Sequence, residues 1–379
     1  MKADAGARVP ADRPVRVAVI GAGWAGGLHL EGFKRTAGTQ LVGIHSRTRT
    51  SAQKLATRYD VAIVASSVAE LIEEADPDLV TIATPPAVHL EQSLEVLAAG
   101  RHLLCDKPIA PTKQEAEQML EAADQAGVLH ASGFIWRGDP ALRRMRQALR
   151  AGLIGEVLEL HSACPLGVPV LPMTWIYEES AGGGALANHG SHILDRAIWL
   201  VGAPISEVCG ELHHDLKEAP DAGAFHNIAE AFAWSRRPRP QGLPTVRVTA
   251  ETGYSCLVRF ANGVRGQLWE GSHHAGAADD EITIIGTDGT LHWTARSGLR
   301  LIRIGAAIEQ LDIEGRTTGS AAVMAREIGK RWAELAAAVT GALRGEATVF
   351  PDLRDGVHVA AASDALRRSH LSRRWEKTT

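Results

Sequence analysis

Short apolar segments alternate with amphipathic segments along the first third of the chain. The apolar runs are rich in branched residues and lie at Val15–Ile20, Leu41–Ile44, Leu79–Ala83, His102–Cys105 and Val128–Ser132. Segments with helical spacing of apolar residues separate them, at 50–59, at 67–75, at 87–99 and from Thr112 onward. Apolar runs of this length are typical of strands buried on both faces. Strands that alternate with helices predict a doubly wound α/β domain with a parallel sheet.

Beyond residue 150 the pattern changes to the polar–apolar alternation of half-buried strands. Alternating segments lie at 155–163, 245–260, 264–270, 281–285 and 291–294, with turn signals at Asn262-Gly263 and Asp288-Gly289. They predict an antiparallel sheet with one covered face. Alanine-rich helical patterns at 321–344 and 355–368 close the chain.

These patterns divide the chain into a flexible tail at 1–14, a first domain at 15–135 and a second domain at 136–379. The last helix is a candidate to pack back on the first domain. The polar segment Asp215–Pro244 ends in arginines and prolines that do not pair inside a sheet. We interpret it as an insertion, either a lid over a substrate or a solvated loop.

Composition and charge exclude several classes of protein. The 40 basic and 44 acidic residues leave a formal charge of −4 without a basic stripe, which argues against a nucleic-acid partner. No apolar run approaches the roughly 18 residues of a membrane helix, and the N-terminus lacks the apolar core of a secretory signal. The four cysteines have no CxxC spacing, so we expect a cytoplasmic protein. The pairs His213-His214 and His273-His274 predict no metal site, because neighbouring residues on a strand point to opposite faces.

The hexapeptide GAGWAG at 21–26 follows the first predicted strand and opens the first predicted helix. In this context it predicts a Rossmann domain at 15–135 that binds a dinucleotide, although a glycine-rich turn without a ligand is the alternative. Gly21 permits the tight turn, Gly23 lets the backbone approach a pyrophosphate, and Gly26 lets the helix lie close to the strand. Trp24 and Ala25 complete this cofactor-binding segment, at a helix N-terminus that favours anions.

The residues after the second strand indicate which dinucleotide binds. An Asp or Glu about 20 residues beyond the glycines accepts hydrogen bonds from the adenosine ribose of NAD. Here Ser46 and Arg47 stand at that point, followed by Arg49. A hydroxyl with guanidinium groups suits a 2′-phosphate, so we predict NADP(H) over NAD(H). The alternative is that the two arginines form a solvated helix start.

Several ordered motifs resemble the Gfo/Idh/MocA family of oxidoreductases. They are GAGWAG at 21–26, TPPAVH at 84–89, Asp106-Lys107-Pro108 and GGGALANHGSHILD at 182–195. The resemblance implies a Rossmann domain followed by an α/β domain with an open, mostly antiparallel sheet, whose exposed face often joins subunits. It also implies cofactor contacts from Thr84, Pro85, His89, Asp106 and Lys107. Asn188 stands where many dehydrogenase members have an Asp, and an amide cannot accept a proton.

Oxidation of an alcohol requires hydride transfer to a nicotinamide and removal of the hydroxyl proton. Within its motif, His192 is the candidate proton acceptor, although a structural role is the alternative for a helical histidine. Lys107 follows a strand end and precedes a proline that stiffens its backbone, so it is expected to stabilise charge on the reacting oxygen. The alternative is a solvated lysine. We expect both groups to meet the reactive ring carbon, with the glycines at 182–184 bringing their backbone near the cofactor.

Three further residues are predicted to contact substrate. Asn188 precedes His192 by one helical turn, so the two share a helix face, and Asn188 is also a candidate catalytic residue. Arg137 follows the last Rossmann strand, where family members contact substrate. Trp175 is either an apolar wall against a sugar ring or a core residue. Asp139-Pro140 has the pattern of a helix N-cap followed by proline.

The sequence therefore predicts an NADP(H)-dependent oxidoreductase that acts on a sugar, cyclitol or glycoside, as a homo-oligomer joined through the C-terminal sheet. Two alternatives stay open. One is an enzyme that cleaves glycosides after a transient oxidation and recycles its cofactor. The other is a regulator that senses the dinucleotide without catalysis.

Overall fold

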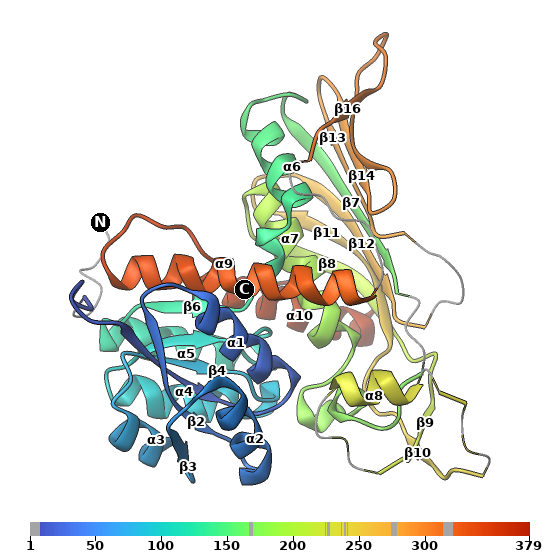
Figure 1. Cartoon of the computed structure of the whole chain (residues 1–379). Helices are drawn as coiled ribbons and strands as arrows, with labels where there is room; N and C mark the ends of the chain where they lie inside the picture. The colour runs from blue at the N-terminus through green and yellow to red at the C-terminus, as the bar shows by residue number, and fades with distance from the viewer. Residues whose placement is uncertain are drawn as a thin grey trace. The chain divides into compact units, whose positions relative to one another are not determined.

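The computed structural model describes residues 8–166, 170–223, 225, 228–235, 237–238, 240, 242–273, 279–313 and 321–379. The chain divides into two compact units (Figure 1). Unit 1 extends to Ile135 and also includes Phe225–Glu230 and Met324–Val357, and unit 2 holds the remainder. His274, one member of the two predicted histidine pairs, lies outside the described residues.

Unit 1 begins with the alternating strands and helices that the sequence predicts. The strands are β1 (Val15–Ile20), β2 (Thr39–His45), β3 (Ile63–Ala65), β4 (Leu79–Ile82), β5 (His102–Cys105) and β6 (His130–Ser132). The helices are α1 (Trp24–Arg35), α2 (Arg49–Tyr59), α3 (Val68–Ala75), α4 (His89–Ala98) and α5 (Lys113–Ala126), with a 3-10 turn η1 (Pro86–Val88). In this part of the chain the strands form one parallel sheet in the order β3-β2-β1-β4-β5-β6. The order reverses direction between β1 and β4, where doubly wound sheets bind ligands.

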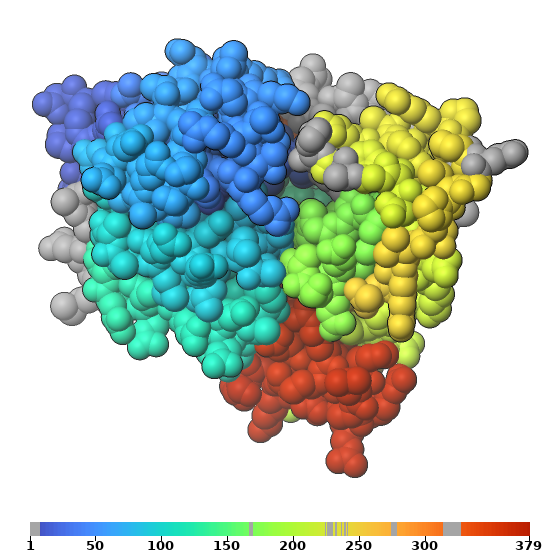
Figure 2. All heavy atoms as spheres, turned by 90° about the horizontal axis from the view of Figure 1, so that it is seen from below, coloured from blue at the N-terminus to red at the C-terminus, as the bar shows by residue number. Residues whose placement is uncertain are grey.

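Local signals place the ends of these helices. The hydroxyls of Ser67 and Thr112 accept hydrogen bonds from backbone N–H groups three residues later, at 3.1 and 3.2 Å, and so begin α3 and α5. Gly127 ends α5 with a φ of 63°, a left-handed conformation that favours glycine. The light blue to teal atoms in Figure 2 show this helical part of unit 1 as one continuous surface.

A late segment of the chain completes unit 1. In α9 (Ala321–Leu343), Trp332 packs on α1, with its ring centroid 3.8 Å from that of His29. A Cβ at Gly32 would lie 3.1 Å from the Trp332 backbone, so glycine allows the two helices to approach closely. The start of the last helix lies in the same unit, where the Arg354 guanidinium donates to both oxygens of Asp124 at 3.0 and 2.9 Å. For the remainder of that helix, packing on the first domain stays a prediction. Most of the late segment in unit 1 is α9, and α10 (Leu353–Ser372) contributes only its first residues.

The described part of the predicted tail, residues 8–14, contacts unit 1. The Val9 N–H donates to the Leu343 carbonyl at 2.9 Å, and the Val9 side chain is buried. The Arg13 guanidinium donates to both oxygens of Asp78, at 2.6 and 2.7 Å. Residues 8–14 are thus held against unit 1 by one apolar anchor and one bidentate ion pair.

Unit 2 combines helices with a large sheet. Its helical elements are α6 (Pro140–Arg150), the 3-10 turns η3 (Trp175–Tyr177) and η4 (Glu179–Ala181), a π-helical turn η5 (Leu186–Gly190) and α7 (Ser191–Val201). The turn η2 (Ile135–Gly138) lies at the division between the units. The principal strands are β7 (Val157–Pro165), β8 (Ile205–His213), β11 (Gly253–Phe260), β12 (Arg265–Gly271), β13 (Glu281–Gly286), β14 (Thr290–Thr294), β15 (Gly298–Ile302), β16 (Glu309–Leu311) and β17 (Glu376–Lys377). Asp139 caps α6 and Pro140 is its first residue, which confirms the predicted cap.

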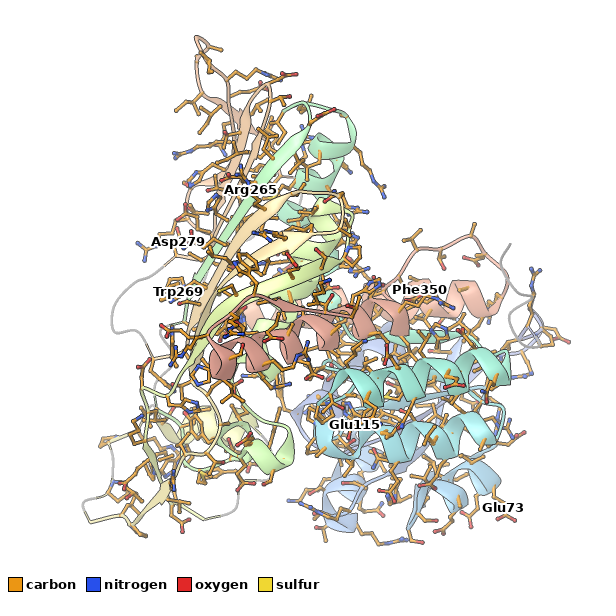
Figure 3. All side chains as sticks on the ribbon, turned by 180° about the vertical axis from the view of Figure 1, so that it is seen from behind. Glu73, Glu115, Arg265, Trp269, Asp279 and Phe350 are labelled. Atoms are coloured by element: carbon orange, nitrogen blue, oxygen red, sulfur yellow. The ribbon has the colours of Figure 1, made fainter. Side chains whose placement is uncertain are left out.

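Among the described residues, these nine strands form one sheet in the order β16-β15-β14-β13-β7-β12-β11-β8-β17. Neighbours pair antiparallel except β7 with β12, which are parallel, so the predicted mostly antiparallel sheet is confirmed. Leu268 and Glu270 of β12 face inward and are buried beneath the helical layer. Arg265 and Trp269, labelled in Figure 3, alternate with them and lie on the opposite, open face.

The predicted insertion at 215–244 contains regular structure, which corrects the loop interpretation. β9 (Glu218–Pro220) pairs with β10 (Thr245–Arg247), and α8 (Ile228–Ser235) lies between them in sequence. The two ends of the segment are therefore joined by strand pairing, which its polar composition did not predict. Over the part of the chain that the structure describes, no helix is long and apolar enough to cross a membrane.

Candidate functional site

The strand register of unit 1 gathers the predicted cofactor residues at one edge of the sheet. Ile20 of β1 pairs with Ile82 of β4 and with His45 of β2, and Ile82 pairs with Cys105 of β5. The four strands therefore end side by side. The residues that follow them are Ser46, Gly21, Ala83-Thr84 and Asp106-Lys107. This carboxyl edge, next to the switch point between β1 and β4, is where open α/β sheets bind ligands.

Each glycine of GAGWAG meets a different demand. Gly21 has a φ of 112°, and a Cβ there would lie 2.5 Å from the Ala83 carbonyl oxygen. A Cβ at Gly26 would lie 2.0 Å from the Gly21 carbonyl oxygen, so α1 packs against its own turn only because this residue is glycine. A Cβ at Gly23 would meet nothing within 4 Å. Gly23 therefore faces open space, which fits a residue that a pyrophosphate approaches.

The start of α1 has the properties of an anion site. Gly23 is its N-cap, and no side chain caps the helix. The first N–H groups of a helix have no acceptor within the helix, and its dipole favours negative charge. Trp24 is 43% exposed at this end. The chain thus fits the dinucleotide that the motif predicts.

Ser46 and Arg47 follow β2 at the same edge. Ser46 is half-buried, and Arg47 is exposed. Arg49 begins α2, which is the helix start that the sequence offered as an alternative for the arginines. No acidic residue stands between His45 and Arg49.

His89 was predicted to bind the cofactor, and the structure buries its ring completely. Nε2 lies 2.8 Å from the Thr84 carbonyl oxygen, and Nδ1 lies 3.1 Å from the Pro108 carbonyl oxygen. Burial lowers the pKa of His89, against the opposing effect of the Thr84 carbonyl, so the ring is neutral at neutral pH. These contacts favour a positioning role, in which His89 joins the loop that contains Thr84 and Pro85 to the loop that contains Lys107.

Asp106 and Lys107 stand at the end of β5. The Lys107 N–H donates to Asp106 Oδ1 at 2.7 Å, the Lys107–Pro108 peptide bond is cis, and the Lys107 side chain is half-buried. Asp106 Oδ2 lies 3.5 Å from His29 Nε2, and His29 Nδ1 contacts the Thr81 hydroxyl. Burial raises the pKa of Asp106, but His29 and the charge of Lys107 outweigh it and hold the pKa below its usual value. The ionised carboxylate thus lies beside the predicted catalytic ammonium.

In unit 2 the predicted catalytic helix begins with a π-helical turn. η5 includes Asn188 and runs directly into α7, which carries His192. Asn188 is partly exposed, and its N–H donates to the Gly184 carbonyl at 2.9 Å. π-Helical turns are rare and occur frequently at functional sites.

Trp136 orients two imidazoles at this turn. The His192 ring stacks on the indole, with centroids 5.1 Å apart and planes at 20°. The His189 ring meets the same indole edge-on, at 4.8 Å and 83°. The two imidazole centroids are 6.2 Å apart. His192 is 7% exposed, while His189 is partly exposed.

Arg137, predicted to contact substrate, directs its guanidinium to α7. Its Nε lies 3.1 Å from both oxygens of Asp195, which is 1% exposed. The next residue, Arg196, donates to both oxygens of Asp280 at 2.7 Å. These pairs neutralise the charges around α7 and favour a positioning role for Arg137.

The glycines that precede η5 serve contacts within unit 2. A Cβ at Gly183 would lie 2.2 Å from the Trp175 carbonyl oxygen. Gly184 has a φ of 115°, and a Cβ there would lie 2.2 Å from the Glu251 carboxylate. Glu251 in turn accepts a hydrogen bond from the Leu186 N–H at 3.0 Å. These contacts explain the need for glycine at 183 and 184, and the approach of this backbone to a cofactor stays a prediction. Trp175 itself is half-buried in η3.

Sequence reasoning missed four residues of these sites: His29, Trp136, His189 and Glu251. Each acts through a partner distant in sequence, so spacing alone gives no signal. His189 could have been found, because it lies inside the GGG…H motif, directly after Asn188, the position that departs from the family pattern.

Comparisons with known proteins agree with this geometry. A model described as "Oxidoreductase family, NAD-binding Rossmann fold" matches residues 15–134, and one described as "GFO/IDH/MocA C-terminal domain" matches residues 142–292. Levoglucosan dehydrogenase of Pseudarthrobacter phenanthrenivorans is 29% identical over 346 residues, 86% of each chain. D-glucoside 3-dehydrogenase of Escherichia coli is 32% identical over 194 residues, which are 50% of this chain and 55% of that protein.

A solved structure of levoglucosan dehydrogenase, in complex with NADH and L-sorbose, has the same fold. Its TM-score is 0.81 over 96% of this chain and 99% of that chain, at 23% identity. Since family models match both the Rossmann domain and the domain that follows it, the chain belongs to the Gfo/Idh/MocA family and is an NAD(P)-dependent oxidoreductase.

Proposed function

We propose that the protein transfers a hydride between NADP(H) and a hydroxyl or ketone carbon of a sugar, cyclitol or glycoside. The observation that carries this proposal is the carboxyl edge of unit 1, where the Gly21–Gly26 cradle, Thr84 and Lys107 follow neighbouring strands. Relatives named levoglucosan dehydrogenase, D-glucoside 3-dehydrogenase and inositol 2-dehydrogenase support a polyhydroxylated substrate.

The dinucleotide would be held by the glycine cradle, the N-terminus of α1 and the loop of Thr84 and Pro85. When bound, its nicotinamide supplies the hydride acceptor or donor. The uncapped N–H groups of α1 bind the pyrophosphate, with Trp24 and Ala25 in the first turn. Asp106 fixes the Lys107 backbone through the 2.7 Å hydrogen bond. His89 holds the two loops in register.

Lys107 and His192 have different roles at the substrate oxygen. The Lys107 ammonium donates a hydrogen bond to the reacting oxygen and stabilises the alkoxide character that develops as the hydride leaves. The His192 imidazole accepts the hydroxyl proton in oxidation and returns it in reduction. Stacking on Trp136 fixes the plane of that imidazole. Asn188 and Trp175, both partly exposed, contribute a hydrogen bond and an apolar wall to the substrate.

The preference for NADP(H) rests on the end of β2. Ser46 and the exposed Arg47 supply a hydroxyl and a guanidinium where NAD-specific domains have an acid. A 2′-phosphate would gain a charge-assisted hydrogen bond there. The free thiols of Cys105, Cys164 and Cys256, all buried, support a reducing, cytoplasmic location.

A second copy of the chain is the proposed partner of the open sheet face in unit 2. Leu158 and Leu257 are 43% and 49% exposed on β7 and β11. Ion pairs of both signs also lie on the sheet, such as Arg265–Glu159 and Arg259–Glu207. A surface with exposed apolar groups and both charges can complement itself in a symmetric dimer. Light scattering of the wild type and of Leu257→Lys tests this: a monomeric wild type would refute it.

The experiment that tests the proposed function is a substrate screen with both dinucleotides. Levoglucosan, methyl D-glucoside and myo-inositol are offered with NADP⁺ and NAD⁺, and the absorbance of reduced nicotinamide is followed. The account expects net reduction with at least one of them. Cleavage of a glycoside without net reduction would favour the transient-oxidation alternative, and no turnover in either assay would refute the proposal.

A further inference from the structure

We propose that His189 is a second substrate-recognising imidazole, which hydrogen-bonds a hydroxyl on the carbon next to the one that is oxidised. The substrate is then an uncharged compound with neighbouring hydroxyls. This inference rests on the proposed function, because it assigns a role within the same oxidation.

The π-helical turn η5 presents few of its side chains. Leu186, Ala187 and Gly190 are buried, whereas Asn188 and His189 are partly exposed. Contacts with β11 and the residues before it hold the turn in place. Glu251 accepts a hydrogen bond from the Leu186 N–H at 3.0 Å, and Gly190 packs so closely on Tyr254 that a Cβ would lie 2.7 Å from its ring. His189 therefore projects from a rigid base, which is the support that a specificity residue needs.

Trp136 sets the orientation of His189 relative to His192. One imidazole stacks on the indole and the other meets its edge, and their centroids are 6.2 Å apart. A hydrogen bond extends about 3 Å from a ring nitrogen. Two rings at this separation can each hydrogen-bond one of two neighbouring oxygens of a ligand. His189 therefore binds the hydroxyl beside the one that His192 deprotonates.

Cys164 distinguishes the two nitrogens of His189. Its sulfur lies 3.7 Å from Nδ1, and burial raises the pKa of the thiol, so that it stays protonated. The contact engages Nδ1 on the sheet side of the ring. We assign Nε2, on the opposite side of the imidazole, to the substrate hydroxyl.

The charges around this turn explain why the substrate should be uncharged. Two guanidiniums beside Trp136 and α7 each bind a carboxylate, Arg137 with Asp195 and Arg196 with Asp280, and a third, Arg146, lies over the Trp199 ring of α7 at 4.6 Å. A guanidinium neutralised by a buried carboxylate does not offer its charge to a phosphate or a carboxylate ligand. Imidazoles that bond hydroxyl groups therefore dominate recognition here.

The test compares one sugar with its deoxy derivatives. The probes are levoglucosan and methyl D-glucoside, each with the monodeoxy derivatives that lack a hydroxyl beside the oxidised carbon. For the wild type, loss of the recognised hydroxyl lowers kcat/KM by about tenfold. His189→Ala is expected to lower kcat/KM by a similar factor for the parent sugar and by less than about twofold for that deoxy derivative. His189→Gln, whose amide can still bond a hydroxyl, retains part of the discrimination.

His161→Ala is the matched control, because His161 lies on the open face of the same sheet and pairs with Glu159 at 3.1 Å. It should leave the parent-to-deoxy ratio unchanged. Equal losses for parent and deoxy sugars in His189→Ala, or no loss at all, would overturn the inference while the proposed function stands. A wild type that oxidises neither parent sugar nor myo-inositol would refute the proposed function itself, and this inference with it.

Discussion

The Arg137 guanidinium is bound to the Asp195 carboxylate, with Nε 3.1 Å from both carboxylate oxygens and Asp195 only 1% exposed. The pair joins η2 to α7, the helix that carries His192. A residue whose position in sequence suggests substrate contact thus stabilises the element that presents the proposed proton acceptor.

Arg137→Met is expected to destabilise the protein by about 3 kcal/mol, because it leaves a buried carboxylate without its guanidinium. Urea unfolding measures this loss. The double variant Arg137→Met/Asp195→Leu, which removes both charges, should recover most of it. A stable single variant with a raised KM would instead show direct substrate contact.

Alanine substitutions at Gly23 and Gly26 should have different effects on NADPH binding and on the free energy of unfolding. Gly23→Ala adds a Cβ that meets nothing within 4 Å, so we expect a change in unfolding free energy below about 1 kcal/mol. The same methyl obstructs a pyrophosphate and should raise the Kd for NADPH by about tenfold or more. Calorimetric titration with NADPH and a thermal melt measure the two effects.

Gly26→Ala should behave differently, because its Cβ would lie 2.0 Å from the Gly21 carbonyl oxygen. We expect a loss of at least about 2 kcal/mol in stability as well as weaker binding. If Gly23→Ala bound NADPH like the wild type, the cradle would not be the pyrophosphate site.

Arg47→Ala tests the basis of the cofactor preference. Removal of the guanidinium should weaken NADPH binding by about tenfold and leave NADH binding nearly unchanged, because only NADPH carries the 2′-phosphate. Ser46→Asp should favour NADH, since a carboxylate repels that phosphate and accepts bonds from the ribose. Tighter binding of NADH than NADPH by the wild type would contradict the preference.

Glu251 should make stability depend on pH. Burial raises the pKa of Glu251, an effect that Arg367 only partly opposes. The native state then binds more protons than the unfolded state, so this contribution to stability is complete below the unfolded pKa of 4.5 and is lost as the pH rises through the folded value. Glu251→Gln keeps an oxygen for the Leu186 N–H and does not titrate.

The Tm of Glu251→Gln should therefore rise relative to the Tm of the wild type as the pH increases above about 4.5. Glu309→Gln, an exposed position on β16, is the control and should show no such trend. A Tm difference that stays constant with pH would mean that Glu251 does not titrate in the folded protein.

The Rossmann strands were predictable because a strand buried on both faces leaves an uninterrupted apolar run, as in Val15–Ile20. The glycine motif was predictable for a similar reason: the φ of 112° at Gly21 and the close approach of Gly26 to the Gly21 carbonyl lie within the motif, although Gly21 also meets the distant Ala83 carbonyl. β3, with three residues, is too short to leave a pattern. The π-helical turn at Asn188 depends on contacts from Glu251, which is distant in sequence.

The site residues also differ in whether the local sequence or a distant contact determines their role. Lys107 could be found because it follows a strand end, which fixes its place at the carboxyl edge. The roles of Arg137 and His89 could not be read, because their partners, Asp195 and the Pro108 carbonyl, become neighbours only in the folded chain. A polar residue in a motif indicates that it has a partner, while the fold decides whether that partner is a ligand or another residue.

The most direct test of the central claim is turnover by Lys107→Ala and His192→Ala, measured beside their NADPH affinity. Each variant should bind NADPH within about twofold of the wild type and lose about a hundredfold or more in kcat for the sugar that the wild type oxidises. The loss in His192→Ala should also remove one limb of the pH–rate profile. Wild-type kcat in either variant, with NADPH binding intact, would contradict the assignment of that residue to the chemical step.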